Sequence, residues 1–174
     1  IAGFEKGGGN LLIHFGDASG CPYEDNPHWS CGTKAFPQWT VEDVWFVSWG
    51  SPSVLPLPLI YLTNGVHAKQ WAYLSQYSVI QHGYRMDFTG VFTESQFCEQ
   101  FHWPSCEGRD NTPYEAYDQL STELNKDPLT AQFLRWKTDI RWILPEEWTI
   151  TGTRSETISV GDTEPLLHPI EQSI

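Results

Sequence analysis

The amino-acid sequence predicts an α/β fold: the last βα units of a (β/α)-barrel-like parallel sheet, followed by helices and a C-terminal β-hairpin and tail. Two observations favour this class. Short apolar segments alternate with segments of helical periodicity, which is the order of a parallel sheet with covering helices. One of the short segments is apolar on both faces, as buried parallel strands are. Because three such units leave open sheet edges, either the C-terminal hairpin or an upstream chain segment must cover them, and we expect the upstream segment to do so. Another protomer is a further possible partner.

Three segments are predicted as strands. Residues 11–15 (LLIHF) form the first, because they are apolar and follow the glycine-rich breaker at 7–9. Residues 44–49 (VWFVSW) form the second and supply the two-sided apolar segment. Residues 86–92 form the third. Prolines after the second strand keep the chain extended as far as Tyr61.

Capping residues and apolar periodicity predict the first helices. Thr40 caps a helical turn that precedes the second strand. Residues 65–81 carry a broad apolar face and suit a longer helix. Residues 93–96 (TESQ) form a capping box, which is expected to open a short helix through Phe101.

Two further helices are predicted after the third strand. Residues 112–115 (TPYE) form a second capping box with proline at the first helical position, and this helix runs to about Leu124. Another helix is expected to start at residues 127–128 (DP), because the following apolar residues recur on one helical stripe. That stripe consists of Leu129, Phe133, Trp136 and Ile140.

These elements divide the chain into three predicted regions. Residues 1–104 form the βα-barrel-like region, and 105–145 form a two-helix extension. Residues 146–174 form an acidic hairpin and tail, with six acidic residues and one basic residue. This last region is expected to be exposed or to lie along a partner.

Charge narrows the classes of partner. Ten basic residues against 22 acidic ones give a formal net charge of −12. Such a charge repels phosphate backbones, and no cluster of lysines and arginines offsets it locally. We therefore expect neither nucleic acid nor an anionic membrane surface as a partner.

No apolar run approaches the ~18 residues of a membrane span. The glycines at 7–9 precede a strand and lack a Gly-Lys-Ser/Thr sequence, so no nucleotide loop and no cofactor is expected.

The four cysteines fall into two close pairs, Cys21 with Cys31 and Cys98 with Cys106. An even number of cysteines in loop-like sequence predicts disulfides, and therefore a secreted or extracellular protein. Of the three connectivities, the local one needs the least reorganisation of the chain.

A zinc site is the competing interpretation of the cysteines, with free buried thiols as a third. His28 lies between the first pair and His102 between the second. However, Pro104 interrupts a helix that would carry the second set, and neither spacing matches a common zinc signature. No metal site is therefore predicted.

The start of the chain carries a further expectation. It begins at Ile1, without methionine and without a charged segment followed by an apolar one. Because the cysteines indicate export, we expect a leader or a longer upstream segment to precede this residue.

Several stretches resemble secreted bacterial proteins of the glycoside-hydrolase-like (β/α)-barrel type. They are residues 43–50 (DVWFVSWG), 56–61 (PLPLIY) and 70–72 (QWA), with 110–113 (DNTP) and 138–142 (TDIRW) in support. The resemblance covers roughly residues 8–142 and implies a barrel fold of mostly uncharacterised function. It transfers no catalytic residue, because the acid pair of lysozyme-like barrels sits on a middle strand, which would precede this chain.

Function in such barrels gathers where strands end and βα loops begin. Asp17 follows the first strand and Glu94 the third, so they are the candidate catalytic pair, since a glycosidase needs two carboxyl groups. Trp49 is a candidate sugar-stacking platform, and Asp87 a candidate substrate-binding residue inside the barrel. Structural roles are the alternative: Asp17 orders a turn, Glu94 lies in a first helical turn, and Asp87 pairs with a nearby base.

The aromatic content suggests a class of ligand. Nine Trp, seven Tyr and nine Phe provide flat rings that fill a core or stack on sugars. We expect a secreted glycoside-hydrolase-like protein that binds polysaccharide or cell-wall glycan and, if it is an enzyme, hydrolyses it. The alternatives are a non-catalytic extracellular surface or assembly protein, and a metal-dependent hydrolase that uses the Cys/His clusters.

Overall fold

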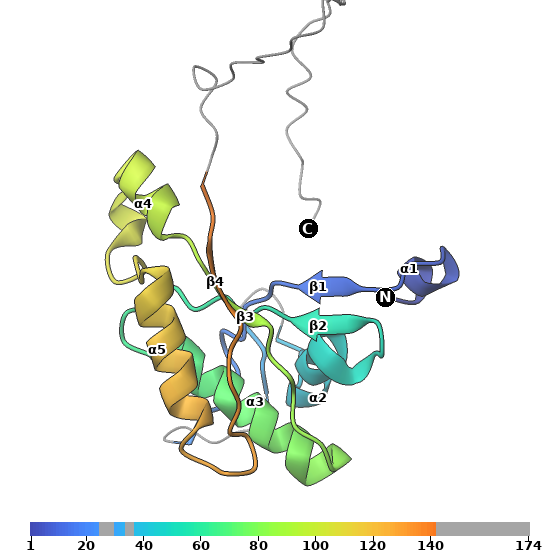
Figure 1. The fold of residues 1–174 in the computed structure, drawn as a ribbon. Helices are drawn as coiled ribbons and strands as arrows, with labels where there is room; N and C mark the ends of the chain where they lie inside the picture. Colours follow the sequence, from blue (N-terminus) through green and yellow to red (C-terminus); the bar gives the residue numbers. More distant parts are fainter. Residues whose placement is uncertain (25–29, 34–36, 142–174) are drawn as a thin grey trace, which may run out of the picture. The chain divides into compact units, whose positions relative to one another are not determined.

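The computed structural model describes residues 1–24, 30–33 and 37–141 (Figure 1). These residues belong to one compact unit. The predicted hairpin and acidic tail at 146–174 lie outside the described residues.

Four short strands and five α-helices alternate along the described chain. The strands are β1 (Leu12–His14), β2 (Val54–Pro56), β3 (Gly90–Thr93) and β4 (Trp136–Asp139). The helices are α1 (Ala2–Lys6), α2 (Val41–Trp45), α3 (Val66–His82), α4 (Ser95–Phe101) and α5 (Pro113–Leu124). A π-helical turn, η1 (Phe46–Gly50), continues α2, and a 3₁₀ turn, η2 (Pro104–Cys106), follows α4.

The strands pair in parallel, β1 with β2 and β3 with β4. The chain beyond β2 joins the two pairs, because Leu59 forms a parallel bridge with Phe92. The backbone N–H of Phe92 donates to the carbonyl of Pro58 at 2.8 Å, and that of Leu57 donates to the carbonyl of His14 at 2.8 Å. The strands therefore follow one another in chain order across the pairing. This sequential parallel order is compatible with the predicted α/β class, in two small parallel sheets rather than a closed barrel among the described residues.

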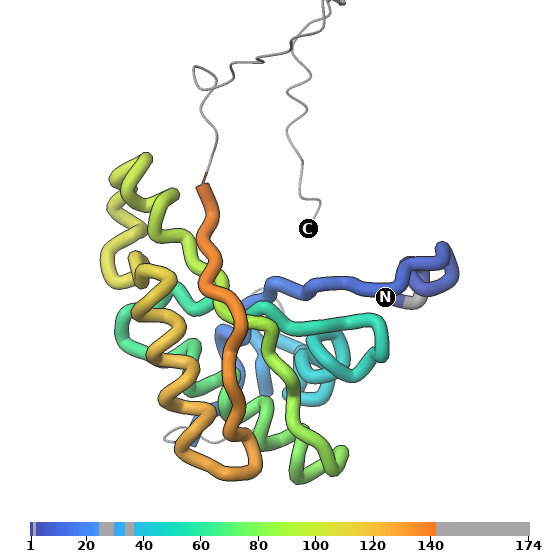
Figure 2. The backbone as a smooth tube through the Cα atoms, in the orientation of Figure 1, coloured from blue at the N-terminus to red at the C-terminus, as the bar shows by residue number. Residues whose placement is uncertain are grey.

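The helices α3 and α5 pack on each other, and α5 also contacts β3 and β4, which lie side by side (Figure 2). Trp71 of α3 is fully buried and meets the ring of Phe88 edge-on, with centroids 6.0 Å apart. Leu120 and Leu124 of α5 and Val91 of β3 complete this part of the core. Burying side chains of this size stabilises the fold by about 1.5–3 kcal/mol each.

The side chains of β3 alternate between two environments. Val91 faces the helices and is buried, whereas Phe92 points to the other side, where its ring lies 5.6 Å from that of Phe15. Because Trp136 pairs with Gly90, it shares the side of Phe92. Phe15 is 64% exposed and Trp136 is 47% exposed. We call the side that carries Phe15, Phe92 and Trp136 the open sheet face.

Two helix starts are confirmed in detail. The hydroxyl of Thr40 accepts from the N–H of Asp43 at 3.2 Å, and the Asp43 carboxylate accepts from the N–H of Thr40 at 2.9 Å. Thr112 and Glu115 exchange the same pair of bonds at 3.3 and 2.9 Å. Each box satisfies N–H groups that a helix start leaves without partners.

The capping box predicted at residues 93–96 is wrong, although its helix exists. Glu94 is the N-cap of α4, and no side chain of its own sequence neighbours caps the helix in the predicted way. The hydroxyl of Thr93 donates instead to the carbonyl of Thr138 at 3.3 Å. The carboxylate of Asp139 accepts from the N–H of Gln96 at 3.0 Å, so the neighbouring strand caps α4.

The predicted second strand at residues 44–49 is a helix, formed by α2 and η1. The capping box at Thr40 starts a helix that continues into the apolar run, and both Val44 and Trp45 are buried. Periodicity alone does not separate a short buried strand from a buried helical turn. The strand of this unit is β2, at Val54–Pro56.

The helix predicted from residues 127–128 is also wrong. The carbonyl of Asp127 accepts from the N–H groups of Thr130 and Ala131, which closes a turn. The chain then returns as β4, because the N–H of Trp136 donates to the carbonyl of Thr89 at 3.1 Å. The third strand is shorter than predicted and begins at Gly90, since the N–H of Phe88 bonds to the side chain of Gln132.

Candidate functional site

Polar side chains gather where the parallel strands end. Asp17 follows β1, Tyr61 follows the extension of β2, and Glu94 follows β3. His67 on α3 and Arg109 on the loop before α5 join them through the contacts described below. We call these five residues the strand-end site.

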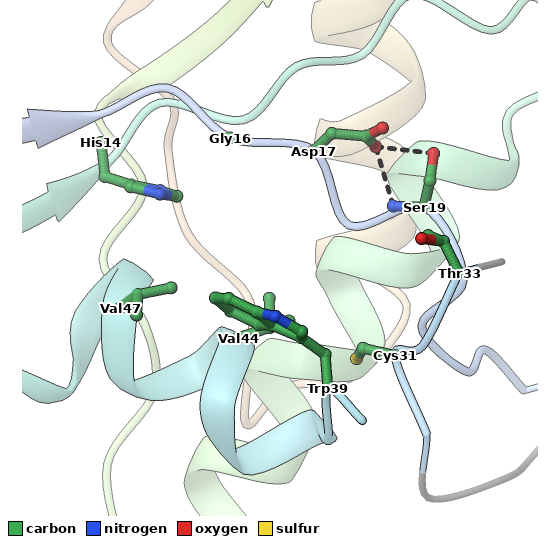
Figure 3. A pocket seen from close by; sticks show the side chains of 9 residues that line it. All are labelled: His14, Gly16, Asp17, Ser19, Cys31, Thr33, Trp39, Val44 and Val47. Carbon is green, nitrogen blue, oxygen red and sulfur yellow. Dashed lines mark hydrogen bonds between the residues drawn. The ribbon is translucent and has the colours of Figure 1, made fainter. Parts of the chain in front are cut away.

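The carboxylate of Asp17 is held by hydrogen-bond donors. Its Oδ1 accepts from the N–H and from the hydroxyl of Ser19, both at 2.8 Å, as the dashed lines in Figure 3 show. Its Oδ2 accepts from the hydroxyl of Tyr61 at 3.3 Å. Asp17 therefore orders the turn after β1, as the structural interpretation predicted, and the same bonds orient its carboxylate toward the site.

His67 lies behind Asp17 and is 1% exposed. Its Nε2 lies 3.2 Å from the hydroxyl of Ser19 and 3.7 Å from Asp17 Oδ1. The imidazole meets the Tyr61 ring edge-on, with centroids 4.4 Å apart. Burial lowers the pKa of His67, the charge of Asp17 opposes this, and the charge of Arg109 lowers the pKa further. The balance favours a neutral imidazole beside the carboxylate.

Tyr61 acts as a donor in this network. Burial, together with the charge of Asp17 and the hydrogen bond to it, raises the pKa of Tyr61 to about 12. The phenol therefore keeps its proton at physiological pH and holds it toward Asp17.

Glu94 is half-buried at the start of α4. Burial raises the pKa of its carboxyl; the charge of Arg109 lowers it, and the charges of Asp139 and Asp17 raise it. The net direction is upward, so Glu94 retains a proton to higher pH than an ordinary glutamic acid. The chain before Tyr61 connects the strand ends that precede the two acids, because the N–H of Leu59 donates to the carbonyl of Gly16 and that of Ile60 to the carbonyl of Phe92, both at 2.9 Å. The two sequence-predicted acids therefore lie at the same edge of the paired strands.

A cavity of about 250 Å³ lies beside Asp17 (Figure 3). A Cβ atom at Gly16 would overlap the ring of His14, so this glycine lets the imidazole pack along the cavity. Burial lowers the pKa of His14, which favours its neutral form. An apolar wall with a few polar groups is typical of small-molecule sites. The lining consists of His14, Gly16, Asp17, Ser19, Cys31, Thr33, Trp39, Val44 and Val47.

Both predicted disulfides are confirmed. Cys21 is bonded to Cys31, which lines the cavity, and Cys98 is bonded to Cys106, which joins α4 to η2. All four cysteine sulfurs are in disulfide bonds, so none of them is available as the thiolate ligand that a zinc site would need. In the part of the chain that the structure describes, no group of three or more His, Cys, Asp or Glu side chains is placed to hold a metal ion.

None of the described helices combines the length and the apolar character that crossing a bilayer requires.

Two predicted substrate-binding residues lie away from the strand-end site. Trp49 lies in η1 and packs against the core, with its indole N–H buried. Asp87 precedes β3, at the opposite end from Glu94, and its carboxylate lies 3.8 Å from Arg135. The tryptophan that lines the cavity is Trp39.

Three residues of the strand-end site were not predicted. Tyr61 ends the proline-rich extended stretch, and its position at a strand end was a usable signal. His67 and Arg109 carry no such signal, because a helix start and a loop after a disulfide bring them to the site only through the fold.

Comparisons with protein-family models, with curated proteins and with solved structures give no match for this chain. The resemblance to glycoside-hydrolase-like barrel proteins stays a prediction.

Proposed function

We propose that this chain is a secreted glycoside-hydrolase-like protein that binds polysaccharide or cell-wall glycan at the strand-end site and hydrolyses it there. The observation that carries the proposal is the placement of Asp17 and Glu94 at the same ends of parallel strands, in contrasting surroundings. Asp17 is accessible and accepts three hydrogen bonds, whereas Glu94 is half-buried. Two carboxyl groups in unlike environments are the arrangement that divides acid from base in glycosidases.

The surroundings assign a role to each acid. Glu94, with its raised pKa, donates its proton to the glycosidic oxygen, and the leaving sugar departs as an alcohol. Asp17 remains the carboxylate that takes a proton from the attacking water or attacks the anomeric carbon itself. The distance between the carboxyl groups decides between these two courses, about 6.5–9.5 Å for inversion and about 5–5.5 Å for retention.

The neighbouring cavity supports a sugar ligand. The flat indole of Trp39 and the side chains of Val44 and Val47 provide an apolar wall, while Ser19 and Thr33 provide hydroxyl groups. Sugars present both an apolar ring face and polar edges, so a lining of this kind suits them. The two disulfides are compatible with the secretion that such a substrate requires.

The test compares Asp17→Asn and Glu94→Gln with the wild-type chain in the release of reducing ends from insoluble glycans. Loss of a positioned acid or base is expected to lower the rate by about 10²–10⁴-fold, while retention on the glycan persists. Glu123→Gln is the matched control, because Glu123 pairs with Lys126 at 2.6 Å near the far end of α5. The wild-type rate is expected to fall as pH rises through the elevated pKa of Glu94. Hydrolysis that survives both site variants contradicts the assignment.

A non-catalytic assembly protein is the second candidate, and the open sheet face favours it. Phe15 and Trp136 stay substantially exposed there, and exposed apolar patches mark interaction surfaces. Light scattering of the wild-type chain and of a Phe15→Ser, Trp136→Ser double variant tests this function. A mass above 19.9 kDa that falls to the monomer value in the variant supports assembly. A monomeric wild-type chain at all concentrations opposes it.

A further inference from the structure

Arg109 supplies the guanidinium group of the strand-end site. Arg109 is exposed, and its Cζ lies 5.8 Å from the ring centroid of Tyr61. Its charge also acts on the pKa values of His67 and Glu94. Arg109 therefore shares the site with the two candidate catalytic carboxyl groups, although it lies far from both of them in the sequence.

The backbone beneath Arg109 is fixed from two directions. Gly108 adopts φ of +71°, a conformation that favours glycine, and its carbonyl accepts from the N–H of Thr63 at 3.1 Å. Asn111 is 1% exposed, and its side-chain amide donates to the carbonyl of Leu62 at 2.9 Å. These bonds join the loop to the chain just after β2, next to Tyr61.

The second disulfide holds the other side of the same loop. The N–H of Arg109 donates to the carbonyl of Cys106 at 2.8 Å, and Cys106 is bonded to Cys98 on α4. Because α4 begins directly after Glu94, the disulfide connects the arginine loop to the element that carries the candidate acid. Such anchoring lowers the entropy that the loop would lose when a ligand binds.

The guanidinium itself makes no ion pair within 4 Å with any carboxylate of the described chain. Its contact with the Tyr61 ring, with Cζ 5.8 Å from the centroid, is a cation–π contact and uses none of the N–H donors in a hydrogen bond to that ring. The planar fork of an arginine matches a carboxylate, with two parallel charge-assisted hydrogen bonds.

We infer that Arg109 binds a carboxylate on the glycan, so that the site takes a uronic-acid-containing polysaccharide. This inference rests on the proposed function, because it names the substrate class of the same site. Arg109 is then a specificity-determining residue, whereas Asp17 and Glu94 act on the glycosidic bond.

The overall charge of −12 does not prevent this binding. Exposed charges are screened beyond about 8 Å at physiological ionic strength, so distant carboxylates contribute little at the site. Of the two acids in the strand-end site, Glu94 is half-buried and its pKa is raised by burial, and Asp17 is engaged by three donors. For a substrate carboxylate in contact with Arg109, the attraction to the guanidinium is therefore stronger than the repulsion from the site's own carboxyl groups.

The experiment measures binding of the full chain to polygalacturonate and to the neutral polymer obtained by reducing its carboxyl groups. The wild-type chain is expected to bind the acidic polymer at least about tenfold more tightly, since a charge-assisted bidentate contact is strong. Arg109→Gln is expected to remove this preference, and Arg109→Lys to restore part of it. Arg135→Gln is the matched control, because Arg135 lies at the opposite end of β3 and β4, beside Asp87.

Each other outcome overturns the inference in a distinguishable way. Equal binding of both polymers by the wild-type chain overturns the carboxylate preference but leaves the proposed glycan function standing. An equal loss for both polymers in Arg109→Gln shows a general structural role for Arg109. Equally tight binding of dextran sulfate shows that the site takes anions without preference for carboxylates. Absence of binding to any glycan overturns the proposed function together with the inference.

Discussion

The two ends of the parallel strands carry similar charged residues in different surroundings. At the C-terminal ends, Asp17 accepts hydrogen bonds from Ser19 and Tyr61, Glu94 is half-buried, and the pKa values of Tyr61, His67 and Glu94 depart from their ordinary values. At the N-terminal ends, Asp87 and Arg135 form an accessible ion pair at 3.8 Å. The comparison shows that residue type alone does not create a chemical site. Partial burial and converging charges do so.

The largest expected effect comes from removing the disulfide that supports the C-terminal ends. A Cys98→Ser, Cys106→Ser double variant is expected to lose about 2–3 kcal/mol of unfolding free energy, because the unfolded chain gains the freedom of an open loop. Denaturant unfolding measures this loss.

The same variant also frees the loop that carries Arg109. Its preference for polygalacturonate over the carboxyl-reduced polymer is therefore expected to fall. A Cys21→Ser, Cys31→Ser variant is expected to keep this preference, because Cys31 lines the neighbouring cavity and a change there affects both polymers. An unchanged preference in the Cys98→Ser, Cys106→Ser variant contradicts the anchoring role assigned to that bond.

A smaller effect is expected from His67 and depends on pH. Burial depresses its folded-state pKa below the ordinary value of 6.5, so the unfolded chain binds more protons as the pH falls. The contribution of neutral His67 to the unfolding free energy is complete above pH 6.5 and is lost as the pH decreases toward the folded-state pKa. Each pKa unit between the folded and the unfolded state corresponds to about 1.4 kcal/mol of unfolding free energy.

Unfolding free energies measured from pH 7 to pH 5 test this effect, and His67→Gln is expected to reduce their slope. His14 acts in the same direction and remains in the variant, so the slope decreases without disappearing. Identical slopes in the two proteins are the contrary result.

The smallest effect is expected at the N-terminal ends. Asp87→Asn removes an exposed ion pair, which contributes about 0–1 kcal/mol, and this change should leave glycan binding unaltered. Thermal unfolding measures the change in stability, and polygalacturonate binding measures the change in affinity. A clear loss of affinity would return Asp87 to the substrate-binding role that the sequence suggested and would weaken the contrast between the two ends.

Local signals in the sequence predicted the parts of the fold that local interactions form. The capping boxes at Thr40 and Thr112 and the long helix α3 need no distant partner to be recognised. For residues 127–139 the local pattern was misleading. Leu129, Phe133 and Trp136 follow a helical period, yet all three are exposed, and pairing with β3 decides the structure.

The site was partly predictable for the same reason. Asp17 and Glu94 were identified because each follows a predicted strand, and parallel strands end at one edge. Arg109 and His67 were not, since a disulfide-bonded loop and the start of α3 bring them to that edge. Trp49 was placed on a strand end that does not exist, because its segment is helical.

The hydrogen bond from Gln96 to Asp139 links the start of α4 to the last described strand, more than 40 residues further along the chain. Asp139 caps the helix that Glu94 opens, and its charge is one of those that raise the pKa of Glu94. A chain cut before residue 139 would therefore lose the cap of α4 and part of the shift of the Glu94 pKa together.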